Sequence, residues 1–123
     1  MSRTLSLVSV ASLALAMGCA AAHAHALLKT ATPAVGGTVS ASPKEIRINF
    51  SEGVEPHFSG IVLTTQAGAS VSLGKADVDP ADKATLVASI PQPLKPGVYT
   101  VTWHAVAIDT HKTQGSFQFT VQP

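Results

Sequence analysis

The sequence predicts an all-β fold: a seven-stranded antiparallel β-sandwich or flattened barrel with Greek-key connections. Apolar and polar residues alternate along several short segments, which is typical of strands that bury one face. Proline and glycine interrupt the chain between these segments, for example at Pro43 and at Pro96 and Gly97. A third observation excludes other classes, because the sequence after the leader shows no helical pattern longer than one turn, no internal repeat and no linker.

The clearest strand predictions lie at 45–50, 97–103 and 115–121, where every second residue is apolar. In the second of these segments Tyr99 and Trp103 are expected to enter the core. His104 follows on the opposite face, where we expect it to pack across strands. Four shorter strands are expected at 26–29, 60–65, 70–73 and 85–90.

The first 24 residues have the layout of a secretory signal peptide. Arg3 supplies a positive charge, and an apolar run over 5–17 is too short to span a bilayer. Small residues follow this run, and cleavage after Ala24 would expose His25 as the first residue. We therefore expect a signal peptide over 1–24 and one exported, periplasmic domain over 25–123.

Two other processing events are compatible with the same leader. Cleavage after Ala22 would start the chain at His23 instead. Alternatively, the Gly-Cys pair at Gly18 and Cys19 could be read as a lipoprotein signal, which would leave an acylated Cys19 in front of both histidines. Only cleavage after Ala24 or after Ala22 places a histidine at the amino terminus.

The composition of the expected mature chain excludes several functions. Cleavage after Ala24 leaves 99 of the 123 residues, enough for one small domain. The mature chain then has seven basic and seven acidic side chains. This balance gives no electrostatic reason to expect nucleic acid or an anionic membrane as a partner. No later apolar stretch is long enough for membrane insertion. The one cysteine and both methionines leave with the leader, so disulfides, thiolate metal sites and His-Cys copper centres are excluded.

Histidine and carboxylate remain as metal donors, and two of them stand close together as Asp109 and His111. In an extended strand, residues two apart point to the same side with Cα atoms about 6.6 Å apart. A carboxylate and an imidazole at this spacing could converge on one ion. The pair alone is weak evidence, because such a triplet is also common in turns.

His25 strengthens the metal interpretation if it becomes the first residue. Its α-amine and its imidazole could then close a chelate ring on one metal ion. With an oxygen of Asp109 and a nitrogen of His111, the set contains three nitrogens and one oxygen, which suits Cu(II). Glu52 could act behind these ligands by accepting a hydrogen bond from the amine or from a ligand's second ring nitrogen.

At this point the sequence resembles the CopC family of periplasmic copper-binding proteins. The resemblance runs through the whole mature chain and is carried by these segments in order: His25-Ala26, Thr32-Pro33-Ala34, Gly36-Gly37, Phe50-Ser51-Glu52, Tyr99 to Trp103, Asp109-x-His111 and Gly115 to Val121. It implies a cupredoxin-like, immunoglobulin-like sandwich that binds one Cu(II) per chain. The implied ligands are His25, Asp109 and His111. The sequence departs from the family's usual Asp-Gly-His by having Thr110 between the two ligands.

A second departure concerns Cu(I). Some members of the family add a methionine-rich Cu(I) site in the region corresponding here to 52–60. No methionine follows Met17, so we expect no such site and interpret His57 as an ordinary loop histidine.

The resemblance implies a non-enzymatic copper carrier or sequestering protein in copper resistance or homeostasis. Its partners would be copper and a membrane copper transporter or another periplasmic copper protein. One alternative is an oxidase or monooxygenase with a histidine brace, which would activate oxygen when loaded with copper. The other is a metal-free immunoglobulin-like adhesion or assembly module, which would show no thermal shift on addition of Cu(II).

Overall fold

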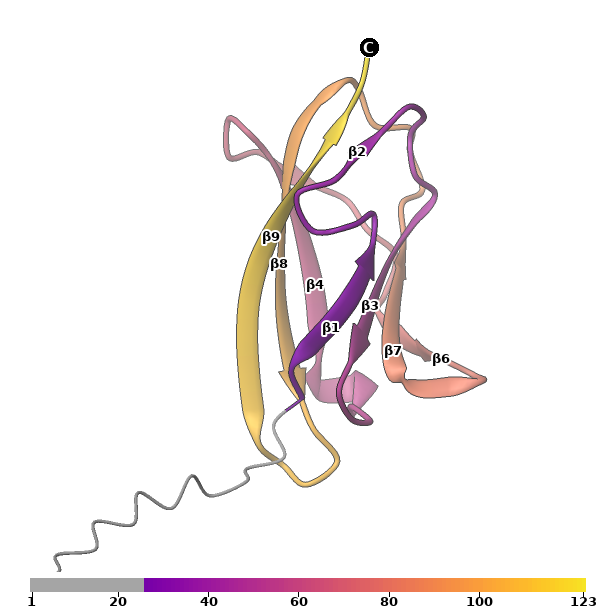
Figure 1. The fold of residues 1–123 in the computed structure, drawn as a ribbon, viewed down its shortest axis with the longest axis vertical. Coiled ribbons are helices and arrows are strands. Elements are labelled where there is room, and N and C mark those ends of the chain that lie inside the picture. Colours follow the sequence, from indigo (N-terminus) through magenta and orange to yellow (C-terminus); the bar gives the residue numbers. More distant parts are fainter. Residues whose placement is uncertain (1–25) are drawn as a thin grey trace, which may run out of the picture.

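The computed structural model describes residues 26–123, and this part of the chain forms nine strands and one short 3-10 helix. The strands make two sheets that face each other in an elongated all-β sandwich (Figure 1). Within the same residues, no helix is long and apolar enough to cross a membrane. The predicted fold class is therefore confirmed.

The first sheet has the order β1 (Leu28–Thr32), β3 (Glu45–Phe50), β7 (Asp82–Ser89) and β6 (Asp77–Asp79). The second has the order β2 (Thr38–Val39), β9 (Lys112–Val121), β8 (Gly97–Val106), β4 (Gly60–Thr65) and β5 (Ser70–Val71). The helix η1 (Pro56–Phe58) precedes β4. Neighbouring strands are antiparallel except β2 and β9, which are parallel.

Each of the seven expected strands is present, and the structure adds the short strands β2 and β6. These two strands have two and three residues, too few to show an alternating pattern. The longest pair, β8 and β9, extends beyond the prediction to Val106 and Lys112. The added part of β9 carries only polar or small residues, with half-buried Thr113 and Gly115 at the alternate positions, and so lacks the apolar alternation that marks a strand.

The core lies between the two sheets and is built from the alternating positions that the sequence indicates. Tyr99 and Trp103 are both buried, as predicted. Trp103 meets Phe50 of the opposite sheet edge-on, with ring centroids 5.0 Å apart. Tyr99 stacks on Phe119, and its hydroxyl donates a hydrogen bond of 2.6 Å to the carbonyl of Lys95.

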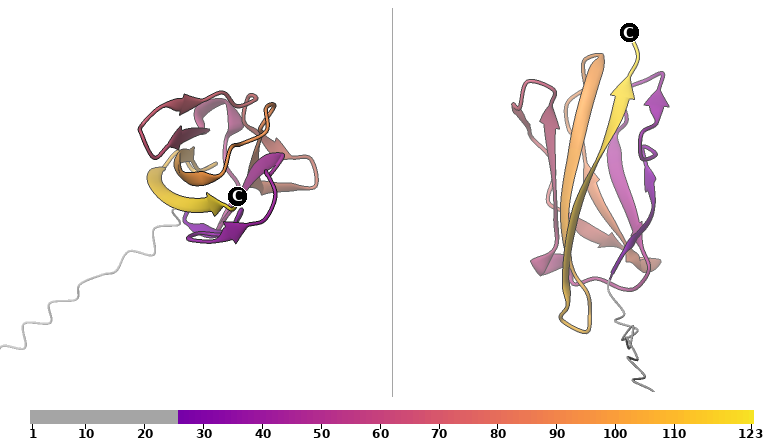
Figure 2. Two further views of the ribbon diagram at one scale, coloured as in Figure 1. Left: turned by 90° about the horizontal axis from the view of Figure 1, so that it is seen from above. Right: turned by 60° about the vertical axis from the view of Figure 1, so that its left-hand side comes forward.

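One end of the sandwich gathers segments that are far apart in the sequence. The turn between β8 and β9, the helix η1 and the start of β1 all lie there, whereas the carboxyl terminus lies at the opposite end (Figures 1 and 2). The backbone N–H of Ser51, just after β3, donates a hydrogen bond of 2.8 Å to the carbonyl of Leu27. The beginning of the described chain is thereby held beside the end of β3.

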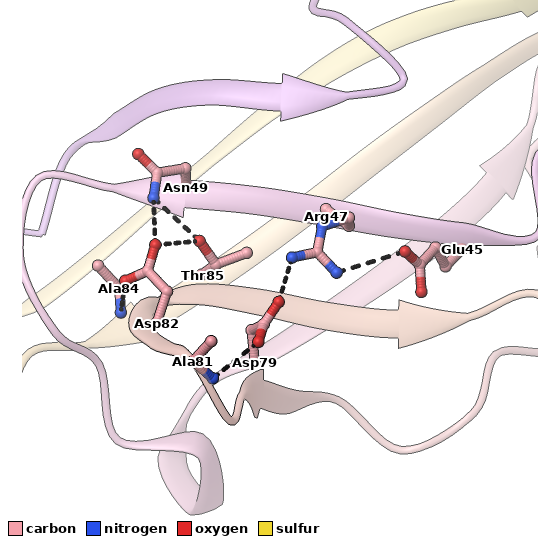
Figure 3. Close-up of polar contacts among 8 residues, drawn as sticks. All are labelled: Glu45, Arg47, Asn49, Asp79, Ala81, Asp82, Ala84 and Thr85. Atoms are coloured by element: carbon pink, nitrogen blue, oxygen red, sulfur yellow. Dashed lines mark hydrogen bonds and ion pairs between the residues drawn. The ribbon is translucent and has the colours of Figure 1, made fainter.

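The first sheet carries a polar network around Arg47 (Figure 3). The guanidinium donates hydrogen bonds to Asp79 and to Glu45. The hydrogen bond from Arg47 is the main cause that holds the pKa of Asp79 below its ordinary value. A hydrogen bond from the backbone N–H of Ala81 lowers this pKa further. The Asp79 carboxylate therefore stays charged at lower pH than an aspartate without these contacts.

Replacing Asp79 by Asn should lower the melting temperature at neutral pH and have less effect in acid. Because its folded-state pKa is depressed, the carboxylate contributes stability above its unfolded-state pKa and loses that contribution as pH falls through the folded-state pKa. Melting curves of wild type and variant at about pH 7 and about pH 3 measure the difference. The matched control is Asp77→Asn, whose carboxylate accepts a hydrogen bond from the neighbouring N–H of Val78. An effect of Asp79→Asn that does not shrink in acid would contradict the prediction.

Candidate metal centre

The turn between β8 and β9 carries the predicted ligand pair, Asp109 and His111. The N–H of Thr110 donates to the carbonyl of Ala107 at 2.8 Å, and the N–H of Ala107 donates to the carbonyl of His111 at 2.9 Å. This is a three-residue hairpin loop, and its third residue, Thr110, has a positive φ of 74°. The expectation that an extended strand aligns the pair was wrong: the chain reverses at these residues, and the turn brings them together.

Asp109 and His111 are in direct contact in this turn. One carboxylate oxygen of Asp109 accepts the backbone N–H of His111 at 3.1 Å. The other oxygen lies 3.1 Å from the Nδ1 atom of the His111 ring. Both side chains are about half exposed, so a metal ion from solution can reach this part of the surface. When Nδ1 donates to a carboxylate, Nε2 of the same imidazole is the nitrogen that can act as a metal donor.

The turn is fixed to the rest of the sandwich through the segment that follows β3. Buried Val54 forms a β-bridge with Ala107, and the N–H of Ile108 donates to the carbonyl of Gly53 at 3.2 Å. The two segments approach closely here, because a Cβ atom on Gly53 would lie 2.7 Å from Cδ1 of the exposed Ile108 side chain. The segment that contains Glu52 is therefore packed directly against the turn.

The amino-terminal end of the described chain reaches the same turn. Ala26 is fully buried, and its carbonyl accepts a hydrogen bond of 2.7 Å from Oγ1 of Thr113. Thr113 stands two residues after His111 on β9. The expected ligand His25, like His23 and Cys19, lies outside the described residues. The described chain therefore begins at a residue that is held against β9.

The side chain of Glu52 places one carboxylate oxygen, Oε1, in the interior without a hydrogen-bond partner among residues 26–123. Its neighbour Ser51 makes two hydrogen bonds with Leu27. The N–H of Ser51 donates to the carbonyl of Leu27 at 2.8 Å, and the N–H of Leu27 donates to Oγ of Ser51 at 2.9 Å. A buried carboxylate oxygen without a donor is costly, so this atom is suited to a positively charged group or an N–H at this end of the sandwich.

The other two described histidines lie elsewhere. His57 is an exposed residue of η1, as expected for a loop histidine. His104 faces outward from β8, and a Cβ atom on Gly60 of the neighbouring strand would lie 2.5 Å from its ring. The expected cross-strand packing of His104 is therefore confirmed. Both His104 and the exposed Phe58 line a groove of about 740 Å³ beside the turn, a feature that the sequence did not indicate.

Among residues 26–123, no three histidine or acidic side chains are grouped closely enough to hold a metal ion. The structure brings Asp109 and His111 together and places Ala26 and Glu52 at the same end of the fold. Sequence reasoning missed Thr113, whose bond to Ala26 joins residues 87 positions apart and leaves no local pattern.

Comparisons with known proteins show the family to which the chain belongs. The model of the CopC domain matches residues 28–122. Protein YobA of Escherichia coli K12 is 41% identical over 99 residues, covering 80% of each chain. Copper resistance protein C of Escherichia coli is 39% identical over 115 residues, covering 88% of this chain and 90% of that protein.

Similar solved structures also come from this family. CopC from Methylosinus trichosporium OB3b superposes with a TM-score of 0.75 at 32% identity, covering 80% of this chain and 95% of that one. PcoC, a methionine-rich copper resistance protein from Escherichia coli, gives 0.73 at 36% identity and is covered completely, against 80% of this chain. Both agree with the cupredoxin-like sandwich that the resemblance implied. The chain belongs to the CopC family of copper resistance proteins.

Proposed function

We propose that the protein is a periplasmic Cu(II) carrier whose mature chain begins at His25. One Cu(II) binds to the α-amine and imidazole of His25, to an oxygen of Asp109 and to a nitrogen of His111. Nitrogen and oxygen donors of this kind suit Cu(II), and the exposed turn gives the metal access from solvent. The protein does no chemistry on the ion: it buffers copper or passes it to a membrane copper transporter or another periplasmic copper protein.

One observation carries the proposal: the hydrogen bond between the Ala26 carbonyl and Thr113. It fixes the chain next to His25 against the strand that begins just after His111. Removal of residues 1–24 would leave the new α-amine only one residue before this anchor. Two donor groups from the amino terminus and two from the turn would then belong to one end of the sandwich.

Glu52 supports the proposal from the buried side. Its Oε1 atom lacks a partner among the described residues and belongs to the segment packed against the turn. In the metal-bound protein we expect this oxygen to accept a hydrogen bond from the α-amine or from a ligand ring. Such contacts orient metal ligands, and their loss typically costs about 10- to 100-fold in affinity.

The first test is a native mass spectrum of protein exported with its own leader and mixed with one equivalent of Cu(II). The expected mass is that of residues 25–123 plus one copper. A protein that starts at an acylated Cys19 would contradict the processing. A chain that starts at His25 but loses copper to a mild chelator would contradict the metal site.

A further inference from the structure

The turn that carries Asp109 and His111 contains a strained residue. Thr110 has a φ of 74°, and among residues 26–123 it is the one residue other than glycine with a positive φ. Backbone in this left-handed region brings Cβ close to the following carbonyl oxygen, so it favours glycine. A β-branched side chain is a pronounced exception at such a position.

The hydrogen bonds of the turn explain why Thr110 takes this conformation. The bonds from Thr110 to Ala107 and from Ala107 to His111 define a three-residue loop whose last residue must be left-handed. If Thr110 relaxed to an ordinary φ, the carbonyl of His111 would lose its alignment with Ala107. The strain is therefore tied to the closed form of the turn, in which Asp109 contacts His111.

The flanking structure confines any opening to this loop. Just before the turn, β8 and β9 are paired up to Val106 and Lys112, and buried Val54 forms a β-bridge with Ala107. Beyond this point the N–H of Ile108 makes the long bond of 3.2 Å to Gly53. Opening therefore breaks a few backbone hydrogen bonds in an exposed turn and leaves the core intact.

We propose that Thr110 is a positioning residue that loosens the ligand turn and thereby speeds copper exchange; this inference rests on the proposed Cu(II) site. Strain in the closed turn raises its free energy relative to the open turn, so the open form is more populated than it would be with glycine. The proposed site uses the closed turn both with and without copper, so the strain largely cancels in the affinity. It acts on the rates of copper entry and release, which both fall when the turn opens less often.

Amide hydrogen exchange in the metal-free protein tests the loosening without copper. The reporter is the N–H of Ala107, which is bonded to His111 across the turn. In Thr110→Gly its exchange should slow about five-fold, the lower end expected for removing left-handed strain. The matched control is Thr110→Ala, which removes the hydroxyl and the branch but keeps Cβ, and should change exchange less than two-fold. Unchanged exchange in Thr110→Gly would overturn the inference.

Stopped-flow transfer of Cu(II) from the protein to EDTA tests the consequence. Thr110→Gly should release copper about five-fold more slowly than wild type, with an equilibrium affinity within about two-fold. Slower amide exchange with unchanged copper release would overturn the role of Thr110 in exchange. A wild-type protein that binds no Cu(II) would instead refute the proposed function, and the amide measurement would still decide whether Thr110 loosens the turn.

Discussion

Replacing His111 by Ala is expected to weaken Cu(II) binding by about 100-fold or more, because a direct ligand should matter at least as much as the outer contacts that orient it. The side chain is half exposed, so the substitution should leave the fold intact. Competition titration against a chelator of known affinity measures the effect, and the melting temperature of the metal-free protein confirms folding. His57→Ala is the matched control: it removes an exposed histidine from η1 and should leave the affinity within about two-fold.

The same prediction extends to the amino terminus. One alanine added in front of His25 converts the α-amine into an amide and breaks the chelate ring, although every side chain remains. This variant should lose copper affinity to a similar extent as His111→Ala. Equal affinities of the extended protein, His111→Ala and His57→Ala would refute the proposed ligand set. An effect of His111→Ala alone would refute the part assigned to the α-amine.

The fold class was predictable because β3, β8 and part of β9 bury every second residue. In β3 and in the carboxyl-terminal half of β9 the apolar residues follow this period closely, and the structure buries them as expected. The paired ends of β8 and β9 near His104 and Gln114 were not predicted, since β9 begins with polar or small residues and has no apolar residue at its inward positions there. The short strands β2 and β6 depend on pairing with β9 and β7, which no local pattern reports.

The candidate site was predictable in its residues but not in its geometry. The sequence indicates Asp109 and His111 by their chemistry and spacing, yet a turn rather than an extended strand joins them. The strain at Thr110 appears only once the backbone is known. Contacts across the fold, such as that between Thr113 and Ala26, depend on tertiary packing that a single sequence does not encode locally.

Replacing Phe50 by Ala is expected to destabilise the protein by about 3–5 kcal/mol, the usual cost of the cavity left by a buried phenylalanine. Phe50 is 1% exposed and packs edge-on against Trp103 of the other sheet, so the substitution removes a contact between the two sheets. The sequence after Cys19 contains no cysteine, and packing must hold the expected mature domain together without a disulfide. Since domains of this size have about 5–15 kcal/mol in total, the melting temperature should fall by about 12 °C or more.

The matched control for this prediction is Phe58→Ala. It removes the same side chain from a position that is 66% exposed, and it should change stability by less than about 0.5 kcal/mol. Urea unfolding of the metal-free proteins, followed by Trp103 fluorescence, measures both variants. Because Phe50 directly precedes the segment that contains Glu52, Phe50→Ala should also weaken Cu(II) binding at temperatures where it is still folded. Similar stability losses in the two variants would show that the packing of Phe50 against Trp103 does not hold the sheets together.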